Sequence, residues 1–141
     1  PVALVFGSYT CPPFRDAAGR PRELHARHGD AVTFLVIYIR EAHALDSFLP
    51  KGGGDDPILE DPRTLAERRR AAGRCREALD LGAIPLLVDT LDDRTRQLYD
   101  AWPDRLFLVD GRGRLAYQGG PGPNGFDLNE LETAINRLLT N

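Results

Sequence analysis

The chain has 141 residues, of which 42% are hydrophobic and 28% charged, the composition of an ordinary globular protein. Its net charge of −3 at neutral pH gives no electrostatic reason to expect a nucleic acid partner, and two cysteines are too few for a disulfide framework. The longest apolar run, residues 32–39, is too short to span a bilayer.

The first half of the chain is predicted to form a strand, a helix and a second strand. Val2–Phe6 is a short apolar run stopped by Gly7, which is typical of a buried strand. A helix is expected over Pro13–His28, with a break near Gly19–Pro21. Ala31–Ile39 is apolar nearly throughout, which predicts a strand covered on both faces. Leu49–Pro62, with three consecutive glycines and three prolines, is predicted to be a loop.

The second half begins with a helix whose ends are well marked. Thr64 with Glu67 three residues later is a capping-box pattern, and Gly82 ends the helical stretch that runs to Leu81. The remaining elements are expected to be a strand, a short helix, a β-hairpin and a final helix capped by Asp127: Ile84–Asp89, Asp92–Tyr99, Arg105–Asp110 with Arg114–Gln118, and the stretch from Leu128 to Leu139.

This order of elements predicts a single α/β domain over residues 1–141. A βαβ start followed by a hairpin and a closing helix is the order of the thioredoxin fold, a three-layer α/β/α sandwich with a mixed central sheet. The additional helix and strand between the halves correspond to the insertion of peroxiredoxin-like members. Pro103 stands where that fold has a proline with a cis peptide bond, although a trans turn proline explains the position equally well.

Cys11 is the first candidate for chemistry. In this topology the loop after the first strand ends at a helix N-terminus, where unpaired backbone N–H groups favour an anion. Such a position lowers the pKa of a thiol, and Pro12 and Pro13 suit a first helical turn. We therefore expect Cys11 to be a thiolate nucleophile, the alternative being an inert packed thiol.

A dithiol mechanism is disfavoured because Phe14 occupies the position at which a thioredoxin carries its second cysteine. The sulfur of Cys11 would then react alone and need a second thiol for its regeneration. Cys75 is the internal candidate for a resolving thiol, but its place in the middle of a helix fits a packing role better.

Glu41 and His43 follow the central strand at the edge of the sheet where open α/β proteins gather their sites. His43 is expected to act as a general acid near Cys11, with Glu41 orienting or tuning it. The alternative is a pair of exposed loop residues. His25 and His28 are predicted to lie on the surface, and no set of residues has the spacing of a metal site.

Several stretches are similar, in the same order, to the catalytic domain of the iodothyronine deiodinases: VALVFGSYTCPPF, FLVIYIREAHALDSF, PLLVDT and DRLFLVDGRGRLAYQGGPGPNGF, followed by the closing helix. The similarity covers nearly the whole chain and is specific around Cys11, His43 and Gln118-Gly119-Gly120. It implies a thioredoxin fold with a peroxiredoxin-like insertion and matches Cys11 to the selenocysteine of that family. By this resemblance Cys11 attacks iodine on the substrate ring, and His43 and Glu41 are the accompanying acid and substrate contacts.

The chain also departs from the family pattern. Sulfur replaces selenium and is a weaker nucleophile towards iodine. Pro62 stands where the family has a histidine, and Pro121 where it has an arginine expected to hold the charged end of the substrate. These differences favour a bacterial-type relative with the same scaffold and another substrate.

Three functions follow from these features. The first is a thiol-dependent oxidoreductase that removes iodine from an aromatic substrate, the second a hydroperoxide reductase, and the third a non-catalytic binding module. Substrate contacts are expected from the aromatic residues Tyr9, Phe14, Phe48 and Trp102 with Pro103, and polar support for a leaving oxygen from Ser8, Thr10 and Arg105.

An enzyme of this kind would hold no cofactor and would use an external thiol or a thioredoxin-type protein as reductant. Its small-molecule substrate would be an iodinated aromatic compound or a peroxide. The sequence does not distinguish a monomer from a homodimer. The domain is expected to be soluble, with a cytoplasmic location favoured. The sequence does not decide whether a longer protein carries a membrane anchor upstream of it.

Overall fold

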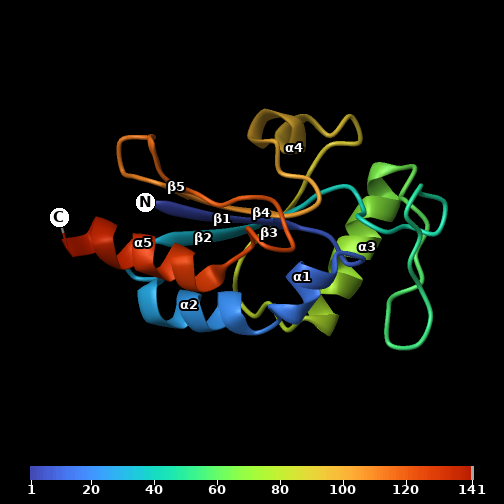
Figure 1. Cartoon of the computed structure of the whole chain (residues 1–141), viewed down its shortest axis with the longest axis horizontal. Coiled ribbons are helices and arrows are strands. Elements are labelled where there is room, and N and C mark those ends of the chain that lie inside the picture. The colour runs from blue at the N-terminus through green and yellow to red at the C-terminus, as the bar shows by residue number, and fades with distance from the viewer. Residues whose placement is uncertain (141) are drawn as a thin grey trace.

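A mixed sheet of five strands organises the structure, a computed structural model that describes residues 1–140 (Figure 1). The strands lie in the order β3-β2-β1-β4-β5: β1 is Val2–Gly7, β2 Thr33–Tyr38, β3 Leu86–Val88, β4 Arg105–Val109 and β5 Leu115–Gln118. Strands β1, β2 and β3 are parallel, β4 runs antiparallel to β1, and β5 runs antiparallel to β4. The predicted α/β fold with a mixed sheet is confirmed.

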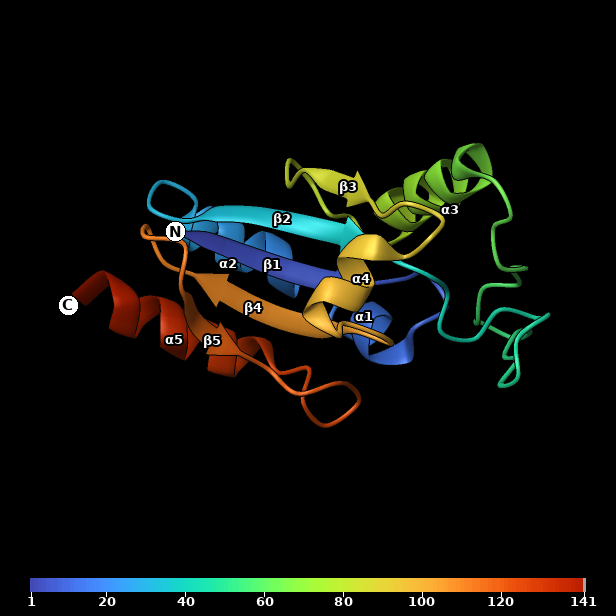
Figure 2. The same cartoon turned by 90° about the horizontal axis from the view of Figure 1, so that it is seen from above.

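The helices cover the two faces of the sheet unequally. They are α1 (Pro12–Asp16), α2 (Arg20–His28), α3 (Leu65–Ala78), α4 (Arg94–Tyr99) and α5 (Leu128–Thr140). Helices α1, α2, α3 and α5 lie on one face, and α4 alone lies on the other (Figures 1 and 2). The three layers are present, but one of them is a single short helix. Within residues 1–140, none of the helices combines the length and the apolar character needed to cross a bilayer.

Two hydrophobic clusters account for the apolar strands. Ala3 and Val5 of β1 belong to the larger cluster, together with residues of the four helices on that face. Leu4 and Phe6 point the other way, into a smaller cluster against which Tyr99 of α4 packs. Because the central strands are covered on both faces, their sequences are nearly continuous apolar runs.

The predicted helix ends agree with the structure to within a few residues. The helix expected over Pro13–His28 is broken where its sequence suggested, since Gly19 adopts a positive φ of 84° between α1 and α2. The capping box is present, with the Glu67 N–H donating to Thr64 Oγ1 at 3.2 Å and the Thr64 N–H donating to Glu67 Oε2 at 3.1 Å. Helix α3 ends at Ala78, three residues before the predicted Leu81.

The strand directions bring three distant segments to one edge of the sheet. Parallel strands β1 and β2 end there, and antiparallel β4 begins there, so Phe6 pairs with both Ile37 and Arg105. The residues just after β1, just after β2 and just before β4 are therefore neighbours in space.

Candidate functional site

A cavity of about 230 Å³ lies at this edge and contains Cys11 in its wall. Its lining combines the start of α1, the segment after β2, the segment before β4 and a loop before α5: Cys11, Pro12, Pro13, Asp16, His43, Lys51, Pro103, Gly122 and Pro123. The peptide bonds before Pro103 and Pro123 are both cis. The structure thus brings together Cys11, His43 and Pro103, as the sequence predicted.

The partner of Cys11 is a residue that the sequence analysis missed. The Sγ atom of Cys11 donates a hydrogen bond to Oδ2 of Asp104 at 3.0 Å, and the Gly122 N–H donates to Oδ1 of the same carboxylate at 2.6 Å. Both the thiol and the carboxylate are buried. The available signal was a charged residue placed between Pro103 and a buried strand, which by itself does not reveal what the side chain contacts.

These surroundings correct the expected ionisation of Cys11. Burial raises the pKa of the Cys11 thiol, and the charge of Asp104 and the hydrogen bond to it raise it further. The Phe14 N–H and the charge of Arg15 lower this pKa, but they are the smaller effects. Cys11 is the N-cap residue of a helix of only five residues, so the helix N-terminus is outweighed. At neutral pH the resting thiol is protonated.

Burial also raises the pKa of Asp104, although the hydrogen bonds from Cys11 and Gly122 act in the opposite direction. The thiol and the carboxylate therefore have their pKa values shifted the same way. A proton that leaves the sulfur has a buried acceptor 3.0 Å away.

Glu41 is buried and contacts Thr10 and Tyr38. Its Oε2 atom accepts hydrogen bonds from the Thr10 N–H at 3.0 Å and the Thr10 hydroxyl at 2.6 Å, and Tyr38 donates its hydroxyl proton to Oε1. Thr10 Oγ1 in turn accepts from the His43 N–H at 3.0 Å. Glu41 thus supports the backbone of His43 through Thr10, and its predicted role in orienting or tuning His43 stays a prediction. Burial raises the pKa of Glu41, while Thr10 and Tyr38 oppose that shift.

The orientation of the His43 ring is set by the loop that follows it. The Nδ1 atom lies 2.8 Å from the Leu49 carbonyl oxygen. Because a carbonyl only accepts, Nδ1 carries the hydrogen, and the neutral imidazole has its lone pair on Nε2. His43 and Cys11 line the same cavity.

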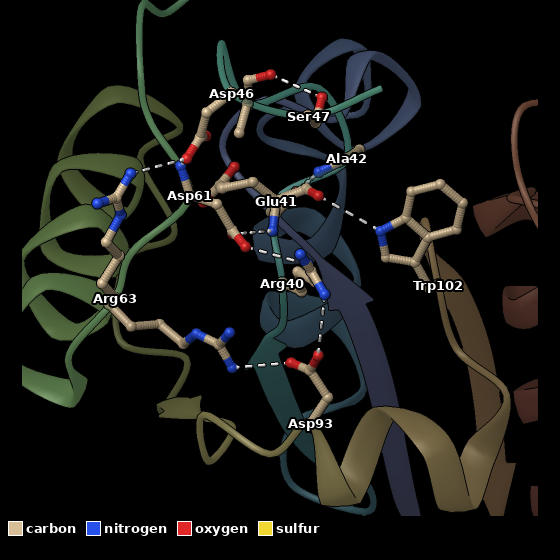
Figure 3. A network of polar contacts seen from close by, with 12 residues as sticks. Arg40, Glu41, Ala42, Asp46, Ser47, Asp61, Arg63, Asp93 and Trp102 are labelled. Carbon is tan, nitrogen blue, oxygen red and sulfur yellow. Dashed lines mark hydrogen bonds and ion pairs between the residues drawn. The ribbon is translucent and has the colours of Figure 1, made fainter. Parts of the chain in front are cut away.

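The segment that carries Glu41 is held by the polar network of Figure 3. The Arg40 guanidinium lies 3.0 Å from Asp61 and 3.9 Å from Asp93, and the Glu41 N–H donates to Asp61 at 3.4 Å. Asp93 also accepts from the buried Arg68 at 3.0 Å. The network ties the end of β2 to α3 and α4, which restricts the movement of the residues that follow β2.

The predicted aromatic contacts divide into two groups. Phe14 is only 3% exposed and makes an edge-to-face contact with Phe126, and Tyr9 packs against the main core cluster. The expectation that the Phe14 ring contacts a substrate is therefore corrected, because its surface is used in the core. Tyr9 is partly exposed, and its substrate contact stays a prediction. Trp102, by contrast, donates its indole N–H to the Glu41 carbonyl at 3.4 Å (Figure 3). Its ring lies 6.3 Å from that of Phe48, which is 79% exposed.

Trp102 and Phe48 line a second cavity of about 380 Å³ that also contains Arg40 and Arg96. Its lining residues Ala42 and Trp102 are the immediate chain neighbours of His43 and Pro103 in the Cys11 cavity. The two cavities are therefore adjacent.

The other predicted residues are engaged elsewhere. Arg105 donates to the Gly119 carbonyl at 2.7 Å and to the Asp100 carbonyl at 2.9 Å, and the buried Ser8 hydroxyl accepts from the Ala42 N–H at 3.2 Å. Cys75 is a fully buried free thiol of α3 whose pKa burial raises to about 12. In the part of the chain that the structure describes, no three His, Cys, Asp or Glu side chains are grouped as a metal site would require.

Comparison with solved structures defines the class of protein. The chain superposes on a thioredoxin-like protein from Aeropyrum pernix with a TM-score of 0.61 at 22% identity, covering 96% of this chain and 76% of that one. A secreted disulfide oxidoreductase from Mycobacterium tuberculosis gives 0.64 at 16% identity, with 97% and 81% covered. The fold and the site together define a thioredoxin-like protein with a single cysteine at the turn from β1 to α1.

Sequence comparison identifies the family within this class. The family model described as iodothyronine deiodinase matches residues 1–139, and the chain belongs to that family. Thyroxine 5-deiodinase of Gallus gallus is 36% identical over 142 residues, which are 99% of this chain and 52% of that protein. The human thyroxine 5-deiodinase is 36% identical over 140 residues, 97% of this chain and 43% of that protein. The chain thus spans about half the length of the curated relatives it matches, and the resemblance seen in the sequence is confirmed.

Proposed function

We propose that the chain is a thiol-dependent reductive dehalogenase that removes iodine from an aromatic substrate. The observation that carries the proposal is the hydrogen bond from Cys11 to Asp104 in the wall of a cavity that His43 also lines. The family to which the chain belongs supports the choice of an iodinated aromatic compound. We propose the natural substrate only by its chemical class, because Pro62 and Pro121 replace polar residues expected from the family resemblance.

The first step transfers the thiol proton to Asp104 as the sulfur attacks iodine. The carbon–iodine bond breaks, its electron pair stays on the ring carbon, and that carbon takes up a proton from the protonated Asp104, directly or by relay through His43. The substrate is reduced to the deiodinated arene, and the sulfur is oxidised to a sulfenyl iodide. Asp104 supplies the basicity that a protonated resting thiol requires.

Regeneration of Cys11 uses an external thiol. One thiol displaces iodide from the sulfenyl iodide and forms a mixed disulfide, and a second thiol releases Cys11 with formation of the oxidised reductant. No bound cofactor is needed for this sequence. Cys75 is the alternative internal thiol, but its complete burial in α3 favours the external one.

Peroxide reduction is the less favoured alternative. It requires a resting thiolate and free polar groups to support the leaving oxygen. Burial and Asp104 raise the pKa of Cys11, and the hydroxyls of Ser8 and Thr10 are engaged in hydrogen bonds within the fold.

The test is iodide release from thyroxine and from 4-iodophenol, measured with dithiothreitol as reductant in the wild type and in Cys11→Ser. We expect one iodide released for each dithiol oxidised in the wild type, and only the rate of the enzyme-free reaction in Cys11→Ser. Cys75→Ala is the matched control, since it removes the other thiol and should retain turnover.

The same samples assayed with hydrogen peroxide distinguish the alternatives. Consumption of peroxide without release of iodide would replace the proposal by a peroxidase function. A wild type that is inactive with both kinds of substrate would favour a non-catalytic binding module.

A further inference from the structure

Lys51 is the single lysine of the chain. The other 17 of its 18 Lys and Arg residues are arginines. It lies in the loop between β2 and α3 and lines the cavity of Cys11. The function proposed above gives it no role. An ammonium group on a flexible four-carbon stem at the mouth of a reactive cysteine cavity is suited to meet an anionic group of a ligand.

The backbone of Lys51 is hydrogen-bonded to that of His43. Its N–H donates to the His43 carbonyl at 3.1 Å, and His43 Nδ1 donates to the Leu49 carbonyl at 2.8 Å. These two hydrogen bonds join residues 49–51 to residue 43. The base of the lysine side chain is thereby held beside His43, while its charged end can adapt to a ligand.

The neighbouring cations are already engaged. Arg15 pairs with Asp56 and donates to the Tyr9 carbonyl at 3.2 Å, and Arg105 donates to the Gly119 carbonyl. Among residues 1–140, no carboxylate lies within ion-pair distance of the Lys51 ammonium. Lys51 is therefore the cation of this cavity that no carboxylate of the described chain neutralises.

Two carboxylates act against it. Asp16 is exposed and lines the same cavity, and the buried Asp104 lies behind Cys11, where its two oxygens accept from Cys11 and Gly122. Asp104 is used in the site itself, so the charge that a ligand meets at the rim is set by Lys51 and Asp16, with His43 adding a positive charge when protonated.

We infer that Lys51 is a specificity-determining residue that favours substrates carrying a carboxylate close to the reacting atom. The inference rests on the proposed function of the Cys11 site and names the charge of its substrate. Lys51 and Asp16 line the same cavity as Cys11, and its volume is only about 230 Å³. Asp16 opposes a carboxylate there, so the two residues predict effects of opposite sign.

The experiment compares two alkylating reagents with the same reactive carbon, the anionic iodoacetate and the neutral iodoacetamide. The rate of S-alkylation of Cys11 is measured for each by peptide mass spectrometry, and the ratio of the two rates is the readout. A change in the ionisation of the thiol affects both rates equally and cancels in the ratio.

We expect the iodoacetate to iodoacetamide ratio to fall about fivefold in Lys51→Ala and further in Lys51→Glu, and to be retained in the matched variant Lys51→Arg. It should rise in Asp16→Asn. In about 1 M salt the differences between variants should largely disappear, because exposed charges are screened.

An unchanged ratio in Lys51→Glu would overturn the inference, provided that the rate with iodoacetamide shows the cavity to be intact. Alkylation requires no turnover, so this outcome is separate from the fate of the proposed function. Iodide release by the wild type together with an unchanged ratio would remove the role of Lys51 and leave the dehalogenase proposal standing.

Discussion

The reactivity of Cys11 is decided by single residues around it. A helix N-terminus and a buried carboxylate act on the same sulfur in opposite directions. The helix contributes mainly the Phe14 N–H, whereas burial and Asp104 dominate and raise the pKa of the thiol. A protonated thiol is also less susceptible to oxidation than a permanent thiolate.

Asp104→Asn separates the two roles of that carboxylate. Loss of its charge removes one cause of the raised thiol pKa, so iodoacetamide should alkylate Cys11 faster in the variant than in the wild type at every pH from 6 to 10. Turnover should fall at the same time, because the amide cannot accept the thiol proton. Alkylation rates and iodide release are measured from pH 6 to 10, and Asp100→Asn, an exposed site, serves as the control. A variant in which turnover rises together with alkylation would contradict the role of Asp104 as the base.

At the scale of elements, α2 and α5 are joined by a cluster of charges on one face of the sheet. Glu132 of α5 lies 2.7 Å from Arg20, 2.5 Å from Arg27 and 3.4 Å from His28, all of α2. Its side chain is mostly buried, and although burial opposes the shift, the three partners together lower the pKa of Glu132. These contacts connect α2, in the first part of the chain, with α5, its last helix.

Glu132→Gln should lower the free energy of unfolding by about 1 kcal/mol at neutral pH, a modest value because its arginine partners are partly exposed. A lowered pKa in the folded state gives stability that is present above the unfolded value near 4.5 and is lost as the pH falls through the folded value. The difference between wild type and variant should therefore shrink below about pH 4. Urea unfolding at pH 7 and pH 3.5 measures it, with the exposed Glu77→Gln as control. A difference that grows in acid would contradict this account.

At the scale of the whole molecule, buried thiol and phenol groups make the free energy of unfolding depend on pH in the alkaline range. Burial raises the pKa of Cys75 to about 12, and that of Tyr117 to about 12, with Glu130 contributing to the latter. Burial and Glu41 also raise the pKa of Tyr38, the large side chain beneath the site. A group with a raised folded pKa stabilises fully below its unfolded pKa, and its contribution is lost as the pH rises towards the folded value.

The free energy of unfolding should accordingly decrease between about pH 9 and 12, where the unfolded thiols lose their protons before the folded ones do. Each such group contributes a slope of about 1.4 kcal/mol per pH unit. Cys75→Ala should make the decline shallower by that amount, whatever the change in stability at neutral pH. Guanidinium unfolding across this range gives the slopes, and equal slopes in wild type and variant would contradict the assignment to buried thiols.

Much of the fold could be predicted from the sequence because its signals are local. The apolar runs of β1 and β2 arise from burial on both faces, and the Thr64 to Glu67 capping box and the break at Gly19 act within one helical turn. The chain order of elements together with strand handedness then restricts the topology. The position of Cys11 between β1 and α1 followed from that order, and so did its proximity to His43 and Pro103 in one cavity.

The chemistry of the site could not be predicted in the same way, because it depends on contacts between segments far apart in the chain. Asp104 is 93 residues from Cys11, and its contact reverses the ionisation expected from the helix N-terminus. Phe14 packs into the core, although its position in the sequence suggested a substrate contact, and the contact of Glu41 with Thr10 also joins segments far apart in the chain.

The sequence by itself therefore determined the order of the elements, the thioredoxin-like class and the position of Cys11 at the turn from β1 to α1. Only the tertiary structure decided whether that sulfur rests as a thiol or a thiolate, and which charges face its cavity. The physical reason is that helix and strand signals come from neighbours along the chain, whereas a pKa depends on every charge and dipole that the fold packs against the group.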